Sequence, residues 1–534
     1  MTAEPVDGLL PGAARGGPMS VRIRSIGILL EPTGLALVVA TVLAIAYVAW
    51  APLAPDLAAQ SARAGAARLT HIGTWWTGWF GGLPLASYSV VVPPVMAVLG
   101  VPLTGGLAVI GTAAAAGPLV QGAVRPRVGA IALAVAAGAD VLGGRTSFAV
   151  GTAVALAAGL ALQRHRPGIA AGLAAVATLC SPLAGLFLGI GALTLLLAIP
   201  RLRRDAALVC GALLGVGIAL ALLSPGSGRM PFSARDLFGA LCMTVAIAVL
   251  CPQRIARIGA ALIAAAEIFF FIVPSSVGVN IGRLTAVFGA AVVIAYSPRH
   301  RLAAAVAAVA LSIGPGLDLT TQIVAGRDAS AHRSYYAPLV HELVQRRDAG
   351  GPAAAGQRVE VVDPRTHGDA SYVAPFVPLA RGWYRQADVA NNPLFYQPGA
   401  LSPASYRKWL DTLAVRWVAV PTATLDYASV NEANLIGSNL RYLRPVWQNA
   451  DWSLYEVDHA LPLADHAIVR PTDGGLTVDV GRAGWVRMRV RWSPTLVLHT
   501  PVGDEGARLA NGDGWVLLNA PDPGRYTISA RNLF

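Results

Sequence analysis

Residues 33–60 read TGLALVVATVLAIAYVAWAPLAPDLAAQ, a long apolar run followed almost at once by an acidic residue, Asp56. Crossing a bilayer takes about 20 apolar residues, so residues 33–51 are predicted to form a first transmembrane helix. No convincing cleavage site follows the run, and we therefore expect the helix to be retained. A charge close to hydrocarbon is costly, which makes Asp56 a candidate functional residue.

The composition favours a membrane protein with a polar tail. Of the 534 residues, 55% are hydrophobic and 13% are charged, which is too apolar for an ordinary soluble protein. The apolar runs end near residue 324. We therefore predict a cytoplasmic segment over 1–32, a polytopic α-helical membrane domain of about 11 spans over 33–325 with a first outer loop at 52–85, an extracytoplasmic α/β domain over 326–460 and a small antiparallel β-domain over 461–534.

Charge and cysteine usage exclude several classes of function. The net charge is +12, but Lys408 is the single lysine, and the arginines of the first half stand in short loops between apolar runs. No basic stripe with interleaved aromatic residues is present, so a nucleic-acid partner is not expected. The four cysteines form no CxxC pair, and the tail has no GxGxxG or Walker sequence. No metal site, nucleotide or other cofactor is expected.

The arginine pattern predicts the topology. Arg22 and Arg24 indicate a cytoplasmic N-terminus, which places Asp56 on the outer face. One more span after the last cluster, at 299–301, puts the tail outside as well. Further spans are predicted to begin near residues 128, 147, 167, 184, 205, 237, 255, 282 and 302.

The stretch 86–124 is long enough for two spans, yet it must cross an odd number of times. Arg125 and Arg127, which follow it, have the character of cytoplasmic loop residues. Proline interrupts helices, and Pro93-Pro94 falls in this stretch. We therefore predict a single span together with a re-entrant or interfacial piece.

Four arginines on the predicted outer side depart from the inside bias: Arg145, Arg229, Arg235 and Arg283. Any one of them could simply extend its head group to the interface from a helix end. As a group beside Asp56 they fit an anion site, because guanidinium groups bind phosphate in a bidentate manner. A phosphate held at a membrane surface suggests a lipid phosphate.

Two further acids lie within apolar runs. Asp140 stands five residues before Arg145, so pairing at a helix end is the favoured interpretation. Glu267 has no partner visible in the sequence. It could be a buried structural carboxylate or part of a polar cavity.

The tail alternates strand and helix patterns and then changes to strands alone. Residues 358–363, 415–420 and 452–457 are predicted strands, and 402–413 is a predicted helix capped by Ser402. Beyond residue 461, short runs such as 485–492 and 514–518 are separated by turn residues, as in an antiparallel β-domain. Its tryptophans could stack on sugars, but a place in the core is favoured.

The run RGWYRQAD, residues 381–388, is the densest polar and aromatic segment of the tail. It has two interpretations of equal weight. It is either a surface loop packed on the membrane domain or a loop that reaches over the Asp56 site and helps to bind an acceptor.

The outer loop continues with WWTGWFGGLP at 75–84 and completes an aromatic-Gly-Gly-x-Pro-x-x-x-Tyr-Ser pattern at 80–89. With the first helix and the acidic loop, this pattern resembles the membrane glycosyltransferases of the GT-C fold. The likeness is greatest to actinobacterial members labelled as 6-pyruvoyl-tetrahydropterin-synthase-related membrane proteins. Segments that support it are 144–151, 181–187, 278–283 and 381–383.

The resemblance implies sugar transfer from a polyprenyl-phosphate donor to an envelope glycan or lipid acceptor at the outer face of the plasma membrane. Asp56 matches the acidic residue that acts as general base, and arginines would hold the leaving lipid phosphate. Many members carry two acids in this loop, so the single Asp56 makes a metal-dependent version less expected and leaves an inactive or repurposed member open. Residues expected to bind substrate are Gln60, His71, Trp76, Tyr88, Arg145, Arg229, Arg235, Asn280, Arg283, Arg381 and Trp383.

Two other functions remain as alternatives: a scaffold protein for envelope assembly, and a non-catalytic transporter or flippase for a lipid-linked glycan. No internal repeat or pair of broken helices of the kind found in transporters is seen in the sequence.

Overall fold

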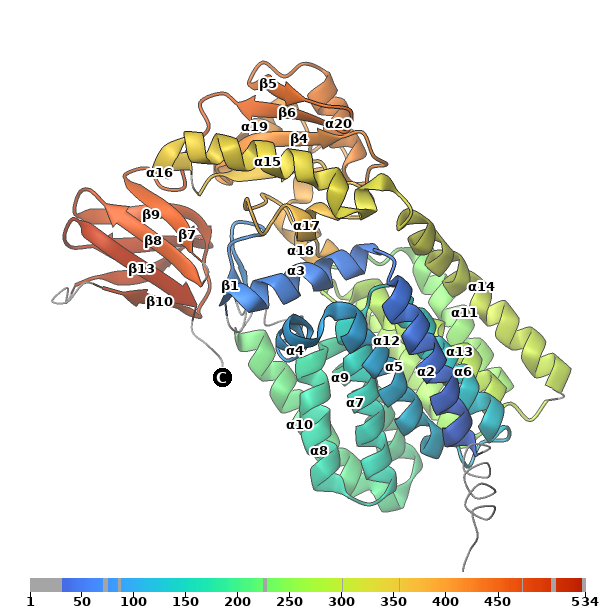
Figure 1. Ribbon diagram of the computed structural model, residues 1–534. Helices are drawn as coiled ribbons and strands as arrows, with labels where there is room; N and C mark the ends of the chain where they lie inside the picture. Colours follow the sequence, from blue (N-terminus) through green and yellow to red (C-terminus); the bar gives the residue numbers. More distant parts are fainter. Residues whose placement is uncertain are drawn as a thin grey trace, which may run out of the picture.

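The computed structural model describes residues 31–70, 75–84, 88–223, 228–299, 301–354, 356–472, 474–500 and 506–530. The predicted cytoplasmic segment therefore lies almost wholly outside the described residues. A bundle of apolar helices makes up the first part, an α/β unit lies over one end of it, and a C-terminal β unit extends to one side (Figure 1).

The bundle is built from helices that are mostly apolar along their whole length. Its members are α2 (Pro32–Trp50), α5 (Val101–Leu119), α6 (Pro126–Leu142), α7 (Thr146–Gln163), α8 (Pro167–Cys180), α9 (Pro182–Ala198), α10 (Arg203–Leu223), α11 (Ala234–Leu250), α12 (Arg254–Ile272), α13 (Arg283–Tyr296) and α14 (Arg301–Ala325). Within the described residues, seven helical stretches are long and apolar enough to cross a membrane. A helical membrane domain is thus supported, while the number of about 11 spans stays a prediction.

Small residues let the helices approach closely. A Cβ on Gly129 of α6 would lie 2.6 Å from the Cβ of Ala295 on α13, and one on Gly117 of α5 would lie 2.6 Å from Thr33 Oγ1 on α2. Close packing of this kind stabilises helix association in lipid, where the hydrophobic effect does not drive helices together.

The stretch 86–124 does contain a short piece and one span-length helix, but the break between them falls at Gly100 and not at Pro93-Pro94 as predicted. A short helix, α4 (Val92–Leu99), precedes the span-length α5, and Pro93 and Pro94 stand in its first turn. Proline is tolerated there because the first N–H groups of a helix have no intrahelical partner.

The segment predicted to be the first outer loop contains a helix that the sequence did not lead us to expect. Helix α3 (Pro55–Thr70) lies across the end of the bundle, beneath the α/β unit (Figure 1). Ala59, Ala62 and Ala66 are buried in the same core cluster as residues of that unit. Helix α3 is thus a platform between the bundle and the tail.

The α/β unit is built on a four-stranded sheet in the order β3-β4-β6-β5. Strands β3 (Arg358–Val361) and β4 (Val415–Pro421) are parallel, and β6 (Trp452–Val457) and β5 (Leu443–Gln448) continue antiparallel. The helices around it are α15 (Arg333–Ala349), α16 (Gly351–Ala354), α17 (Asp369–Tyr372), α18 (Arg385–Asn391), α19 (Pro403–Thr412) and α20 (Val430–Gly437). The predicted cap is confirmed, since Ser402 Oγ accepts from the backbone N–H of Ser405.

The C-terminal unit is made of two antiparallel sheets, ordered β10-β13-β8-β7 and β11-β12-β9. Their strands are β7 (Ala467–Thr472), β8 (Gly475–Val480), β9 (Gly484–Arg491), β10 (Leu496–His499), β11 (Arg508–Gly512), β12 (Trp515–Ala520) and β13 (Gly524–Ala530). The core prediction for its tryptophans is wrong for Trp485, which is 50% exposed. Trp492 and Trp515 are partly buried against core clusters.

The tryptophan loop connects the two units of the tail. Its strands β1 (Trp75–Trp76) and β2 (Leu83–Pro84) pair with each other. Trp75 belongs to the core of the C-terminal unit, whereas Trp79 and Phe80 belong to the core of the α/β unit. Arg491 also donates from Nε to the carbonyl oxygen of Phe80 at 2.8 Å. The loop is therefore a structural part of the tail.

Candidate functional site

A cavity of about 1190 Å³ lies between the end of the helical bundle and the segment 383–387. One part of its wall is apolar and comes from α6, α13 and α14, with residues such as Val135, Val287 and Leu319. The other part carries Asp56, Tyr88, Arg145, Arg235, Arg283 and Trp383. Such a cavity can accept a ligand with an apolar tail and a charged head.

Asp56 stands in the first turn of α3, where the positive end of the helix dipole favours a carboxylate. Its Oδ2 lies 3.5 Å from Arg145 Nε and 3.7 Å from Arg283 Nη2. Both distances exceed those of a tight charge-assisted hydrogen bond. The side chain is 32% exposed, so a ligand in the cavity can reach the carboxylate.

Arg145 is held by more than one acid. Its Nη1 lies 3.2 Å from Asp140 Oδ1, which confirms the predicted pairing, and its Nη2 lies 3.4 Å from Asp318 Oδ2. Together with Asp56, three carboxylates surround one guanidinium group. Arg145 is thus neutralised by the protein and mainly fixes the position of Asp56.

Gly144 allows this arrangement. Its φ is +79°, a conformation that favours glycine, and a Cβ at this position would lie 2.3 Å from the backbone nitrogen of Leu57. The turn between α6 and α7 can therefore press against the start of α3. That contact brings Arg145 to Asp56.

Arg283 and Arg235 are better placed to bind an anion. Arg283 begins α13 and contacts Asp56 alone among the acids of the described residues. Arg235, near the start of α11, is exposed at the cavity and forms no ion pair within the described part of the chain. The side chain of Asn280 is also at the cavity wall.

Aromatic rings close the side of the cavity that faces the tail. The rings of Tyr88 and Tyr384 are stacked with centroids 4.7 Å apart. Trp383 lies beside them at the wall, and the Arg385 guanidinium stands 4.7 Å from the centre of its ring. Flat aromatic faces of this kind suit a sugar or another planar or ring-shaped group.

The remaining predicted residues lie elsewhere. Gln60 is buried and accepts a hydrogen bond from Ser147 Oγ at 2.7 Å, and Trp76 is buried in the α/β core. Arg229 is exposed, and its backbone N–H donates to Gln386. His71 lies outside the described residues. The structure therefore places Gln60, Trp76 and Arg229 outside the cavity lining.

Arg381 is directed away from the cavity into the α/β unit. It is 2% exposed, and its guanidinium lies 2.9 Å from Asp363 Oδ2 and 2.6 Å from Asp388 Oδ2. The segment 381–388 thus has one part buried in the α/β unit and another part at the cavity. Arg381 anchors it internally, while the residues from Trp383 to Ala387 reach the cavity.

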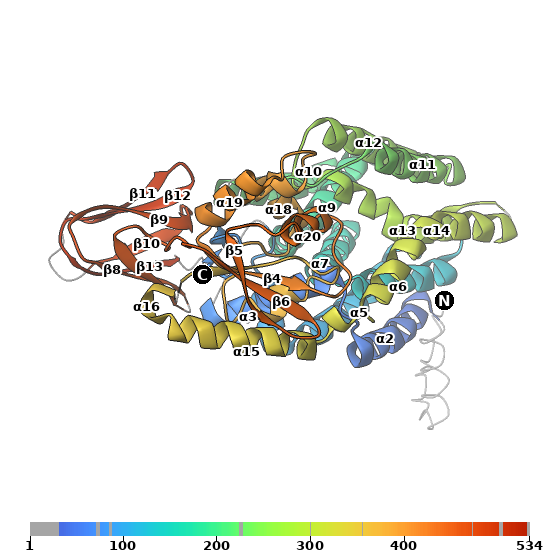
Figure 2. The same ribbon diagram turned by 90° about the horizontal axis from the view of Figure 1, so that it is seen from above.

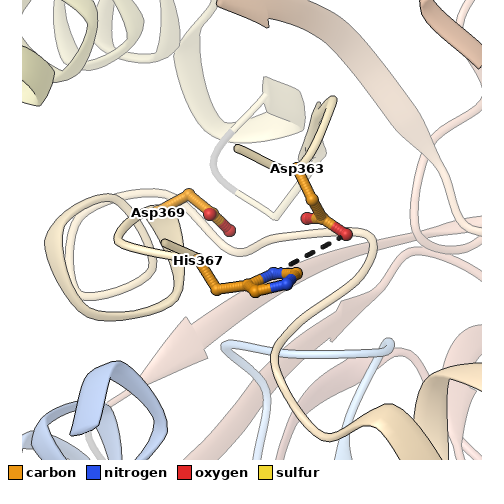
Figure 3. Close-up of side chains that lie close together, drawn as sticks. All are labelled: Asp363, His367 and Asp369. Atoms are coloured by element: carbon orange, nitrogen blue, oxygen red, sulfur yellow. Dashed lines mark ion pairs between the residues drawn. The ribbon is translucent and has the colours of Figure 1, made fainter. Parts of the chain in front are cut away.

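Several residues near the sites were missed from the sequence. Asp318 and Arg385 lie far along the chain from Asp56, and no local pattern connects them with it. Asp363, His367 and Asp369 form a buried group whose potential ligand atoms all lie within 4.8 Å of one another (Figure 3). Their spacing, Asp-x-x-x-His-x-Asp, was the signal that could have revealed them.

Burial governs the protonation of this second group. It lowers the pKa of His367 to about 4, so the imidazole is neutral at neutral pH. Burial also raises the pKa of Asp369 to about 7. The group therefore resists carrying net charge unless a cation compensates it.

The comparisons with known proteins found no relative: no protein-family model, no curated protein and no solved structure matches the chain.

Proposed function

We propose that this protein is a membrane glycosyltransferase that moves a sugar from a polyprenyl-phosphate donor to an envelope glycan or lipid acceptor. The observation that carries the proposal is the cavity that combines an apolar wall with a carboxylate between two arginines. A lipid-linked phosphate has the matching chemistry, since it joins a long apolar chain to an anion.

The parts of the cavity suggest how the donor would lie. The apolar wall from α6, α13 and α14 would receive the first isoprene units, and the phosphate would meet Arg283 and Arg235. The sugar would then lie towards Tyr88 and Trp383. Asp56 would face the carbon at which the donor bond breaks.

The reaction needs a base and stabilisation of the leaving group. The acceptor hydroxyl oxygen forms a bond to the anomeric carbon, and its proton passes to the Asp56 carboxylate. The bond between the anomeric carbon and the phosphate oxygen breaks, and the electron pair leaves with the lipid phosphate. Arg283 and Arg235 would stabilise the negative charge that develops there.

The proposed orientation follows from charge. Arginines gather at the helix connections opposite the tail, where Arg125 Nη1 donates to Ser297 O at 2.8 Å and Arg299 Nη1 to Val249 O at 3.1 Å. The positive-inside rule assigns such an end to the cytoplasm. Asp56 and the tail would then face the outside of the plasma membrane.

The test compares Asp56→Asn with Asp205→Asn, an acid in the first turn of α10 at the opposite end of the bundle. Purified full-length protein in nanodiscs is incubated with labelled polyprenyl-phosphate sugars and an envelope glycan extract. We expect Asp56→Asn to lower transfer by about 10²–10⁴-fold, the usual contribution of a general base, and Asp205→Asn to leave it unchanged. Equal transfer by wild type and Asp56→Asn would refute the role of Asp56.

A transport assay in sealed vesicles tests the transporter alternative. Movement of the labelled donor across the bilayer without any glycosylated product would indicate a transporter. Product formation that depends on Asp56 would exclude it.

A further inference from the structure

The α/β unit buries more carboxyl groups than guanidinium groups at one place. Six carboxylates are at most 7% exposed, and the guanidinium groups that contact them are those of Arg381 and Arg385. The acids are Glu360, Asp363, Asp369, Asp388, Asp426 and Glu432. Isolated buried carboxylates are costly, so this excess calls for protons or for a further cation.

His367 points to a cation as the missing partner. Its side chain is 1% exposed, and neither ring nitrogen has a hydrogen-bond partner within the described residues. Nδ1 faces Asp363, with 3.9 Å to Oδ2, while Nε2 faces Asp426, with 3.4 Å to Oδ2. Asp369 approaches from the other side of the group, and its Oδ1 likewise has no partner (Figure 3).

We propose that Asp363, His367 and Asp369 bind one divalent metal ion, which fixes the tail side of the cavity. The site is separate from Asp56, and it does not depend on the proposed transferase activity.

The surroundings resemble those of ligands in known metal sites. A metal-bound histidine usually gives the N–H of its second nitrogen to a carboxylate, and Asp426 stands in that position at Nε2. Asp426 is itself held by Arg385, whose Nη2 lies 2.6 Å from Oδ2. Arg381 Nη2 lies 2.9 Å from Asp363 Oδ2 and would hold that ligand in place.

The ligand set favours zinc. One imidazole with two carboxylates suits zinc or manganese better than magnesium or calcium, which prefer oxygen ligands alone. The three ligand atoms would need to move closer together around the ion, because zinc–ligand bonds measure about 2.0–2.2 Å.

The metal would act on the cavity through Trp383. The rings of His367 and Trp383 are stacked face to face, with centroids 3.3 Å apart and planes 12° from parallel. Trp383 lines the cavity, and Arg385 contacts both the Trp383 ring and Asp426. An ion on His367 would therefore stabilise the segment that forms this wall.

The first experiment measures metal in purified full-length protein by mass spectrometry, before and after incubation with Zn²⁺ or Mn²⁺. We expect about one equivalent of zinc in wild type, as for a single site. His367→Gln and Asp369→Asn should lose it. His341→Gln, which changes an exposed histidine on α15, should keep it.

Cobalt substitution makes the result independent of how the variants fold. Wild type stripped with EDTA and refilled with Co²⁺ should show visible absorption bands of a low-coordinate site. Failure of wild type to retain any of the three ions, or equal retention by well-folded His367→Gln, would overturn the proposal.

Hydrogen exchange tests the effect on the cavity. Exchange in residues 381–388 should rise at least severalfold when EDTA removes the ion and return when Zn²⁺ is restored. Unchanged exchange in metal-loaded and stripped protein would refute the role in fixing the wall, whatever the transferase assay shows.

Discussion

Arg145 and Arg283 contact the same carboxylate, yet their surroundings give them different roles. Arg145 is shared among Asp56, Asp140 and Asp318, whereas Arg283 contacts Asp56 alone of the acids in the described residues. The sequence allowed the prediction that both arginines lie beside Asp56. It could not show that their roles differ, because Asp318, which pairs with Arg145, lies 173 positions further along the chain.

We predict that the two arginine substitutions affect different properties, one mainly stability and the other mainly ligand binding. Arg145→Gln leaves the Asp140 carboxylate, which is 3% exposed, without its cation and should destabilise the fold by on the order of 3 kcal/mol. Arg283→Gln should change stability less and weaken binding of polyprenyl phosphate about tenfold or more. Thermal unfolding in detergent and a lipid-phosphate binding titration measure the two effects. Similar stability losses with unchanged binding would contradict this assignment.

Glu432 provides a prediction about pH. Tyr406 donates to its Oε1 at 2.8 Å, and burial raises the pKa of the carboxyl to about 7 despite the nearby Arg381. The folded protein therefore keeps a proton that the unfolded chain releases near its ordinary value of 4.5. The resulting stabilisation is complete below that value and is lost as pH rises towards 7.

Glu432→Gln should remove this pH dependence, because the amide carries no titrating proton. Between pH 5 and 7, wild type should lose up to about 1 kcal/mol per pH unit relative to the variant. Unfolding midpoints measured at several pH values check the difference. A wild type that gains stability over the variant with rising pH would show that the sign is wrong.

Most helices and several tail strands could be predicted at the scale of single elements. The predicted starts of the later spans agree within three residues with α6 to α14, since charged loops and prolines mark the ends of apolar runs. Helix α3 was missed because its alanine-rich sequence is neither apolar enough for a span nor strongly periodic. Proline near its start, Asp56 in its first turn and Arg68 in its last were signals for a helix.

The turn at Gly144 should be sensitive to a single methyl group. Gly144→Ala places a Cβ against the backbone of Leu57 and forces a positive φ on alanine, so α3 and α7 must separate. We expect a loss of about 1–3 kcal/mol in stability and a larger loss of transfer activity. Gly191→Ala on α9, where no atom lies within 4 Å of the new methyl group, is the control. Full activity in Gly144→Ala would show that this contact does not position the site.

At the scale of the whole molecule, the bundle and the tail form a continuous structure through α3 and the tryptophan loop. Viewed from above, the α/β unit covers the bundle while the C-terminal unit extends to one side (Figure 2). The sequence predicted both units but not their dependence on the first loop. Contacts across 291 residues, such as Trp79 Nε1 to Ala370 O at 3.3 Å, leave no local pattern.

Trp79→Ala should therefore loosen parts of the protein that are far apart in sequence. The side chain is fully buried, and Gly382 packs so closely that a Cβ there would lie 2.3 Å from the Trp79 ring. We expect a cost of about 3–5 kcal/mol and faster hydrogen exchange in both α3 and 370–384. Trp485→Ala, at a half-exposed position, should have little effect. Faster exchange confined to the loop would contradict the coupling.

The contact between Phe80 and Arg491 also has a consequence for biogenesis. Its two partners are 411 residues apart, and a ribosome adding about 5–20 residues per second needs roughly 20–80 s to make the second after the first. For that time Trp75 has no partner from the C-terminal unit. The nascent loop lacks this contact during that time, and a chaperone or insertion factor that shields aromatic side chains would act on the loop then.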